Sequence, residues 1–274
     1  MMTGDVPLRL LISDIDGTLV RSDKSLADAT VEAVRRLTTA GLPVSLISAR
    51  PASGMRWIAE KLGLEGPFGA FNGGVLFMAD GTVIERCFID CAVAHTMISL
   101  IADAKITCWV FADDQWFSNN ADDPHTRREI ASANVEPNIT NDFSDLIERA
   151  DKIVGVSDDH AMLADLEIRA IAAGQGKATI ARSQPYYLDI TAKIANKGDG
   201  ITYLAKAFGV EMGEVAVIGD QANDLPMFAR AGLSIVMGQA PAPVKAQAMI
   251  ATDSNDDDGV ASAISNIILP RVLR

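Results

Sequence analysis

Short apolar runs alternate with amphipathic stretches along the first part of the chain. Residues 8–13 are mostly apolar and end in polar side chains, which is typical of a strand buried in a parallel sheet. Residues 25–40 then carry apolar side chains at near-helical spacing, and Gly41 is a helix stop signal. A second apolar run at 44–47 and a helical stretch at 53–62 repeat the alternation. This order predicts βαβ units with right-handed crossovers in a doubly wound parallel sheet.

The middle of the chain has a less regular pattern. It begins after the turn signal at 72–74 and a predicted hairpin, 75–78 with 82–85. Beyond the hairpin, the pattern favours helices at 92–104, 126–133 and 161–173, and strands at 107–111, 115–117, 152–157 and 178–181. We interpret residues 85–188 as a separate α+β cap domain inserted into the first domain.

The first pattern returns at Lys197. Helices are predicted at 198–208, 224–231, 242–248 and 259–268, and strands at 215–218, 233–236 and 250–252. Residues 1–84 and 189–274 are therefore expected to form one discontinuous, Rossmann-like α/β core. The acidic run Asp256–Asp258 is expected to cap the last helix at its positive end.

Composition and charge restrict the possible partners. Of the 274 residues, 49% are hydrophobic and 22% charged, which is an ordinary globular profile. The net charge of −12 is the wrong sign for a nucleic-acid footprint, so we expect no such partner. No apolar run is long enough to span a bilayer, and residues 1–9 lack the apolar stretch of a signal peptide. Three cysteines cannot form a complete disulfide framework, which favours a cytoplasmic location.

Two carboxylates follow the first predicted strand. Asp14 and Asp16 lie just beyond the carboxyl end of the strand, where ligands bind in open α/β sheets. Gly17 allows a sharp turn there. A solvated turn that uses aspartate as a turn former explains an isolated Asp-x-Asp-Gly about equally well.

A second acidic cluster shifts the balance towards chemistry. Asp220 and Asp224 follow the predicted strand at 215–218 and could meet the first cluster across a parallel sheet. Crowded carboxylates repel one another unless a hard cation such as Mg²⁺ collects them. The pairing of acidic strand ends therefore indicates a metal site.

Groups that could hold an anion lie between the two clusters. Ser48 ends the second strand and offers a hydroxyl beside a helix amino terminus, while Lys197 opens a helix and supplies a positive charge. A solvated helix end would explain Lys197 alone, but not its combination with the other three segments.

These residues resemble the haloacid dehalogenase superfamily of phosphotransferases, and within it the Cof-type sugar-phosphate phosphatases. The segment 14–19 is similar to the first family motif, Ser48 to the second, Lys197 to the third and 219–224 to the fourth. The resemblance covers nearly the whole chain, and the family's α+β cap lies between the second and third motifs.

The resemblance implies a Mg²⁺-dependent hydrolase that forms an aspartyl-phosphate. Asp14 would be the nucleophile, and Asp16 would protonate the leaving alcohol and then deprotonate the attacking water. The metal ligands would be the Asp14 side chain, the Asp16 backbone carbonyl and Asp220, with Asp224 in support.

The same resemblance assigns the phosphate contacts. Ser48, Ala49 and Lys197 would bind the phosphoryl oxygens, and Asn223 would orient Lys197 or the phosphate. The pair Ser48-Ala49 replaces a more common Thr-Gly but keeps the hydroxyl, so little chemical loss is expected. Gln221 replaces a smaller residue after the fourth-motif aspartate, which bears on the geometry near the metal.

Several alternatives remain open at this point. Within the same fold, the chain could be a narrow glycosyl or glyceryl phosphate phosphatase, or a phosphomutase. From another class, it could be a non-catalytic sensor of a phosphorylated metabolite. Cys87, Cys91 and His95 share helical spacing, but a soft-metal site there lacks a fourth ligand. The sequence specifies neither the small phosphorylated substrate nor whether the protein is a monomer or a homodimer.

Overall fold

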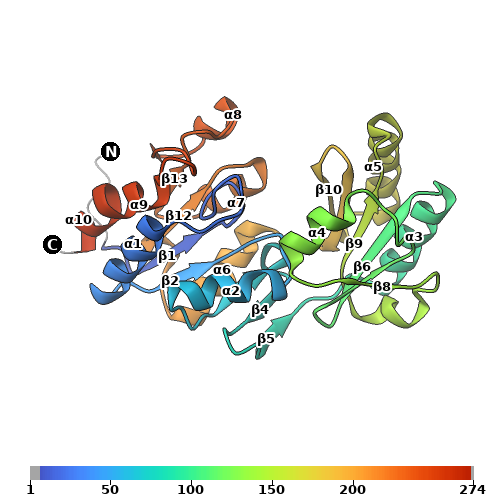
Figure 1. The fold of residues 1–274 in the computed structure, drawn as a ribbon, viewed down its shortest axis with the longest axis horizontal. Helices are drawn as coiled ribbons and strands as arrows, with labels where there is room; N and C mark the ends of the chain where they lie inside the picture. The colour runs from blue at the N-terminus through green and yellow to red at the C-terminus, as the bar shows by residue number, and fades with distance from the viewer. Residues whose placement is uncertain (1–6, 273–274) are drawn as a thin grey trace. The chain divides into compact units, whose positions relative to one another are not determined.

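The computed structural model describes residues 7–272 and divides into two compact units (Figure 1). The first, called the core unit, comprises the described residues of Met1–Ala49, Arg56–Ile84 and Asn196–Arg274. The second, called the inserted unit, comprises Arg50–Met55 and Glu85–Ala195. The prediction that residues 1–9 hold no signal peptide falls mostly outside the described residues; within them, no helix is long and apolar enough to cross a membrane.

The core unit is built on a five-stranded sheet in the order β14-β13-β12-β1-β2, with every neighbouring pair parallel. Its strands are β1 (Leu10–Ser13), β2 (Val44–Leu46), β12 (Val215–Gly219), β13 (Leu233–Val236) and β14 (Ile250–Ala251). From β1 the chain first adds β2 on one side and later adds β12, β13 and β14 on the other, so the strand order reverses between β1 and β12 and the sheet is doubly wound. The predicted fold class, a Rossmann-like core with an inserted α+β unit, is confirmed.

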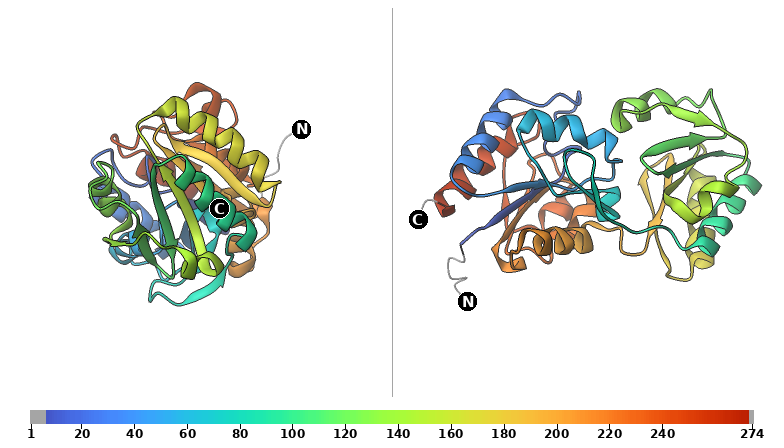
Figure 2. Two further views of the ribbon diagram at one scale, coloured as in Figure 1. Left: turned by 90° about the vertical axis from the view of Figure 1, so that its right-hand side faces the viewer. Right: turned by 90° about the horizontal axis from the view of Figure 1, so that it is seen from below.

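Helices cover both faces of this sheet (Figure 2). They are α1 (Asp28–Thr39), α2 (Ser53–Leu62), α6 (Lys197–Phe208), α7 (Leu225–Phe228), α8 (Ala242–Lys245), α9 (Gly259–Ala263) and α10 (Leu269–Val272). Leu10 and Ile12 of β1 pack with Ile201 of α6 and Met227 of α7 in one apolar cluster. Each such side chain contributes about 1.5–3 kcal/mol by leaving water, so the strand that leads to Asp14 is firmly fixed.

Two glycines let the start of α6 lie directly against the short helix η1 (Phe71–Gly73). A Cβ on Gly73 would lie 2.4 Å from the Cα of Gly200, and one on Gly200 would lie 2.6 Å from Cδ1 of Ile47. Gly73 also has φ +95°, in the left-handed region that favours glycine. This close approach fixes the first turn of α6, where Lys197 lies. On either side of η1 in the sequence, β3 (Phe68–Ala70) and β4 (Val75–Phe77) form a small sheet with β5 (Val83–Arg86), in the order β3-β4-β5.

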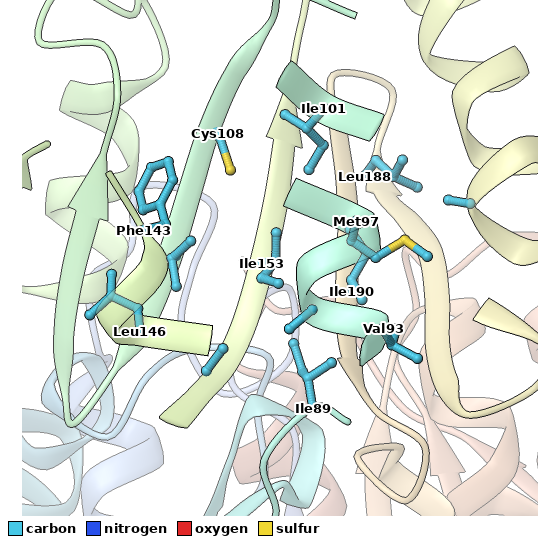
Figure 3. Packing of buried hydrophobic residues seen from close by; sticks show 14 of the residues in the cluster. Ile89, Val93, Met97, Ile101, Cys108, Phe143, Leu146, Ile153, Leu188 and Ile190 are labelled. Carbon is cyan, nitrogen blue, oxygen red and sulfur yellow. The ribbon is translucent and has the colours of Figure 1, made fainter. Parts of the chain in front are cut away.

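The inserted unit is a six-stranded sheet in the order β10-β11-β9-β6-β7-β8. Its elements are α3 (Cys91–Asp103), β6 (Thr107–Ala112), β7 (Gln115–Ser118), α4 (Thr126–Ala133), β8 (Pro137–Ile139), β9 (Ala150–Val156), α5 (His160–Gly174), β10 (Ala178–Gln184) and β11 (Tyr187–Ala192). Alternate residues of the central strands pack with the buried face of α3 in an apolar core of the unit's own (Figure 3). The labelled members of this core are Ile89, Val93, Met97, Ile101, Cys108, Phe143, Leu146, Ile153, Leu188 and Ile190.

Strands β8 and β11 are absent from the sequence-based expectation. β11 pairs with both β9 and β10, and it runs past residue 188, the expected end of the inserted segment. The sheet of the inserted unit therefore continues to Ala192. Helices α7 and α8 are shorter than expected, with four residues each.

Candidate active site

Asp14 and Asp220 lie at the carboxyl ends of neighbouring parallel strands. β1 pairs with β12 so that Ser13 is opposite Ile218. Asp14 follows Ser13 directly, and Asp220 lies two residues beyond Ile218. The backbone N–H of Asp14 donates to the carbonyl of Ile218 at 2.9 Å, which continues the pairing one residue further. Both side chains are buried, with 4% and 3% exposed. The structure thus brings together the two acidic strand ends that the sequence placed 206 positions apart.

Lys197 joins two carboxylates within this cluster. Its Nζ donates to Oδ1 of Asp14 and to Oδ1 of Asp224, at 2.5 Å in each case. Lys197 is the first residue of α6, and the Asn196 side chain caps that helix by accepting from the N–H of Asp199 at 3.0 Å. The capped helix start therefore holds a buried ammonium between two buried carboxylates.

Asp224 uses both of its oxygens inside the protein. While Oδ1 accepts from Lys197, Oδ2 accepts from the backbone N–H groups of Asp220 at 2.7 Å and Gln221 at 2.9 Å. Asp224 is fully buried. It therefore fixes the loop that presents Asp220, which suits a supporting role better than direct coordination of a metal.

The loop after Asp14 turns against Asp220. Gly17 has φ +76°, and a Cβ there would lie 2.4 Å from Oδ2 of Asp220, so only glycine fits. The Thr18 hydroxyl donates to Oδ1 of Asp220 at 3.2 Å. The Asp16 carboxylate accepts from Nζ of Lys24 at 2.7 Å, and about a third of its side chain is exposed. Asp16 therefore faces solvent at the edge of the cluster, where a leaving group could be reached.

The predicted phosphate-binding residues lie at different depths. Ser48 is buried at the end of β2, its backbone N–H donating to Gly69 and its carbonyl accepting from the N–H of Asn72. Ala49 is half-buried. Asn223 is exposed, and among the described residues Lys197 is oriented by Asp14 and Asp224 rather than by Asn223. Contact of these groups with a phosphate stays a prediction.

Burial and mutual repulsion alter the protonation of the cluster. Burial, aided by the charges of Asp224 and Asp220, raises the pKa of Asp14 to about 8, although Lys197 opposes the change. Burial and the Asp224 charge likewise raise the pKa of Asp220 to about 6. Burial would lower the pKa of Lys197, but Asp14 and Asp224 together raise it above its usual value. The site thus holds more negative charge than its single lysine neutralises.

The carboxylates of the cluster make a site rich in oxygen, which suits a hard divalent cation. One ligand atom from each of Asp14, Asp220 and Asp224 lies within 4.8 Å of the others, and oxygen-only donors suit Mg²⁺. Among residues 7–272 this is the only such grouping of three or more His, Cys, Asp or Glu side chains. Cys87, Cys91 and His95 do not form such a grouping.

Some residues that hold the site were not expected from the sequence. The Gln239 amide donates to the carbonyl of Gly17 at 2.5 Å, and its oxygen accepts from the N–H of Asn255 at 3.1 Å. The Asn255 amide in turn donates to the carbonyl of Val20 at 3.0 Å. Lys24 was also missed. These side chains act across long sequence separations, and no spacing pattern marks them.

Comparison with known proteins places this geometry in a family. The family model of haloacid dehalogenase-like hydrolases matches residues 11–264, which is nearly the whole chain. The resemblance inferred from the four sequence motifs is therefore confirmed.

Curated relatives and solved structures agree with this match. The HMP-PP phosphatase of Cronobacter sakazakii is 28% identical, with 85% of each chain covered. A 5-amino-6-(5-phospho-D-ribitylamino)uracil phosphatase of Bacillus subtilis is 26% identical, covering 97% of this chain and 98% of the relative. The crystal structure of a haloacid dehalogenase-like hydrolase from Bacteroides thetaiotaomicron is 29% identical, with a TM-score of 0.87 over 95% of this chain and 99% of that one.

Proposed function

The chain belongs to the haloacid dehalogenase-like hydrolase family as one of its phosphatases, and we propose that it hydrolyses a small phosphorylated metabolite with Mg²⁺ through an aspartyl-phosphate. One observation carries the proposal. Asp14 is buried at a strand end, lies 2.5 Å from Lys197 and shares its site with Asp220 and Asp224. This arrangement supplies a carboxylate nucleophile beside a fixed positive charge.

The first step transfers the phosphoryl group to Asp14. A carboxylate oxygen of Asp14 attacks phosphorus, and the bond between phosphorus and the ester oxygen breaks. Asp16 donates a proton to the departing alkoxide, which leaves as an alcohol. Lys197 and the Ser48 hydroxyl donate hydrogen bonds to the phosphoryl oxygens as their charge shifts.

The second step releases phosphate. Asp16, now a carboxylate, takes a proton from a water molecule that attacks the phosphorus of the aspartyl-phosphate. The bond between phosphorus and Asp14 breaks, which regenerates the nucleophile. Nζ of Lys24 lies 2.7 Å from Oδ1 of Asp16 and would help to hold this side chain beside the cluster.

The acidic cluster is the proposed metal site. The side chains of Asp14 and Asp220 and the backbone carbonyl of Asp16 would hold the ion, with Asp224 fixing the loop behind them. When bound, Mg²⁺ offsets the repulsion between the anionic nucleophile and the anionic phosphate.

A sugar phosphate is the proposed substrate class. The relatives named above act on phosphorylated organic compounds of low molecular mass, and one of those compounds carries a phosphorylated ribityl chain. A reaction centre made of Asp14, Asp16 and Lys197 recognises the phosphoryl group and makes no demand on the alcohol. Specificity must therefore come from residues outside this cluster.

A substrate screen tests the proposed function directly. We expect free phosphate to be released from an aryl phosphate and from some members of a panel of sugar, nucleotide and cofactor phosphates, only when Mg²⁺ is present. An isomerised phosphate ester without free phosphate would identify a phosphomutase instead. Tight binding of a phosphorylated compound without turnover of any substrate would favour the non-catalytic sensor.

Mg²⁺ affinity should rise with pH. The pKa values of Asp14 and Asp220 are raised to about 8 and about 6, so protons occupy part of the metal-free site near neutral pH. Mg²⁺ binds the carboxylates, so it must displace these protons, and the competition weakens as the pH rises through this range. Calorimetry in buffers of different ionisation enthalpy should record proton release on Mg²⁺ binding. An affinity that does not change from pH 6 to pH 8.5 would contradict the prediction.

A further inference from the structure

The carboxylate of Asp220 is held by two uncharged donors from different loops. The Thr18 hydroxyl donates to Oδ1 at 3.2 Å, and the side-chain amide of Gln221 donates to Oδ2 at 3.1 Å. Asp220 itself is buried, while Gln221 is exposed. Each carboxylate oxygen of Asp220 therefore accepts one hydrogen bond, Oδ1 from the loop after β1 and Oδ2 from the loop after β12.

These two hydrogen bonds oppose the electrostatic repulsion between the Asp220 carboxylate and its acidic neighbours. Asp220 lies close to the carboxylates of Asp14 and Asp224, and the only ammonium in the cluster is already bound to those two. Without its own donors, the Asp220 side chain would gain by rotating away from its neighbours. Donors on both oxygens hold it in place, and each oxygen keeps a further lone pair for a ligand.

We propose that Gln221 is a positioning residue for the metal site, a role that rests on the proposed Mg²⁺ dependence. Its amide fixes the orientation of Asp220 so that the carboxylate is arranged for the ion before the ion arrives. The amide is neutral, so it adds no positive charge that would repel a cation bound by Asp220, as a lysine would.

Mg²⁺ titration of a Gln221→Leu variant tests the role. Leucine has a similar size but no donor, and an exposed position tolerates it. Calorimetry on the metal-free protein should show an Mg²⁺ dissociation constant raised about 10-fold, the lower end of the range seen when partners of metal ligands are removed. At saturating Mg²⁺ and substrate, kcat should stay within about threefold of the wild-type value, because the reacting groups are intact.

Two controls separate this inference from the proposed function. Gln247→Leu removes an amide from another exposed position and should leave Mg²⁺ binding unchanged. Asp220→Ala should abolish binding. If Gln221→Leu binds Mg²⁺ as the wild type does while Asp220→Ala does not bind it, the positioning role is overturned and the metal site stands. If Asp220→Ala also binds Mg²⁺ normally, or the wild type binds none, both are overturned.

Discussion

Replacing Asp14 with asparagine is expected to lower kcat/KM for an aryl phosphate by at least about 10⁴-fold, as loss of a covalent nucleophile does in other hydrolases. The amide oxygen is uncharged and a far weaker nucleophile than a carboxylate, and the residual site cannot form the aspartyl-phosphate. The fold should persist. Lys197 keeps Asp224 as a partner, and the variant removes a carboxyl whose burial is unfavourable. Steady-state kinetics at saturating Mg²⁺, with a thermal melt of the same sample, checks both parts.

A matched aspartate distinguishes the nucleophile from a general effect of charge. Asp103 is exposed at the end of α3, so Asp103→Asn changes the net charge equally and should leave hydrolysis unchanged. Near-normal hydrolysis by Asp14→Asn would show that another group attacks phosphorus. Loss of activity together with a collapsed melting curve would instead assign Asp14 a structural role.

The strands that present the site could be predicted because they are continuous apolar runs. The sequence predicts strands at 8–13 and 215–218, and the structure has Leu10–Ser13 and Val215–Gly219. A parallel strand covered on both faces carries apolar side chains at nearly every position, so its pattern is visible without knowledge of its neighbours. The ends of such strands, and hence the places of Asp14 and Asp220, follow directly.

Contacts between distant loops could not be predicted in this way. Asp258 directly precedes α9 at the positive end of the helix, as expected, but its side chain makes no capping hydrogen bond there. Asp258 instead accepts from Arg21 at 2.8 Å, and Asp256 accepts from the N–H and the hydroxyl of Ser22. The sequence of an acidic run gives its charge, but its hydrogen-bond partners are set by the tertiary fold, which brings residues 21–22 next to residues 256–258.

Strand β11 of the inserted unit also could not be predicted, because it depends on contacts with other strands. Its residues, Tyr187–Ala192, alternate between the two faces of the sheet and pair with β9 and β10 over most of their length. The segment is short and mixes polar with apolar side chains, so its strand character depends on those neighbours. The boundary expected at 188 fell inside it for this reason.

Replacing Lys197 with methionine should affect both stability and activity. Lys197 is buried and bonded to Asp14 and Asp224, so its loss leaves two carboxylates without a counter-charge. Removing one member of a buried ion pair typically costs about 3–5 kcal/mol in the free energy of unfolding. The loss of a fixed donor to the phosphoryl oxygens should lower kcat by about 10²–10³-fold.

The pH dependence of the Lys197→Met variant identifies the cause of its instability. Burial already raises the pKa of Asp14, and removal of the ammonium raises it further, so the folded variant binds protons more readily than the unfolded chain. The metal-free variant should therefore regain stability as the pH falls from 8 towards 5. Urea denaturation at several pH values measures this, with Lys206→Met, an exposed lysine of the same helix, as the control. A destabilisation equal at every pH would mean that lost packing, rather than unpaired carboxylates, explains the defect.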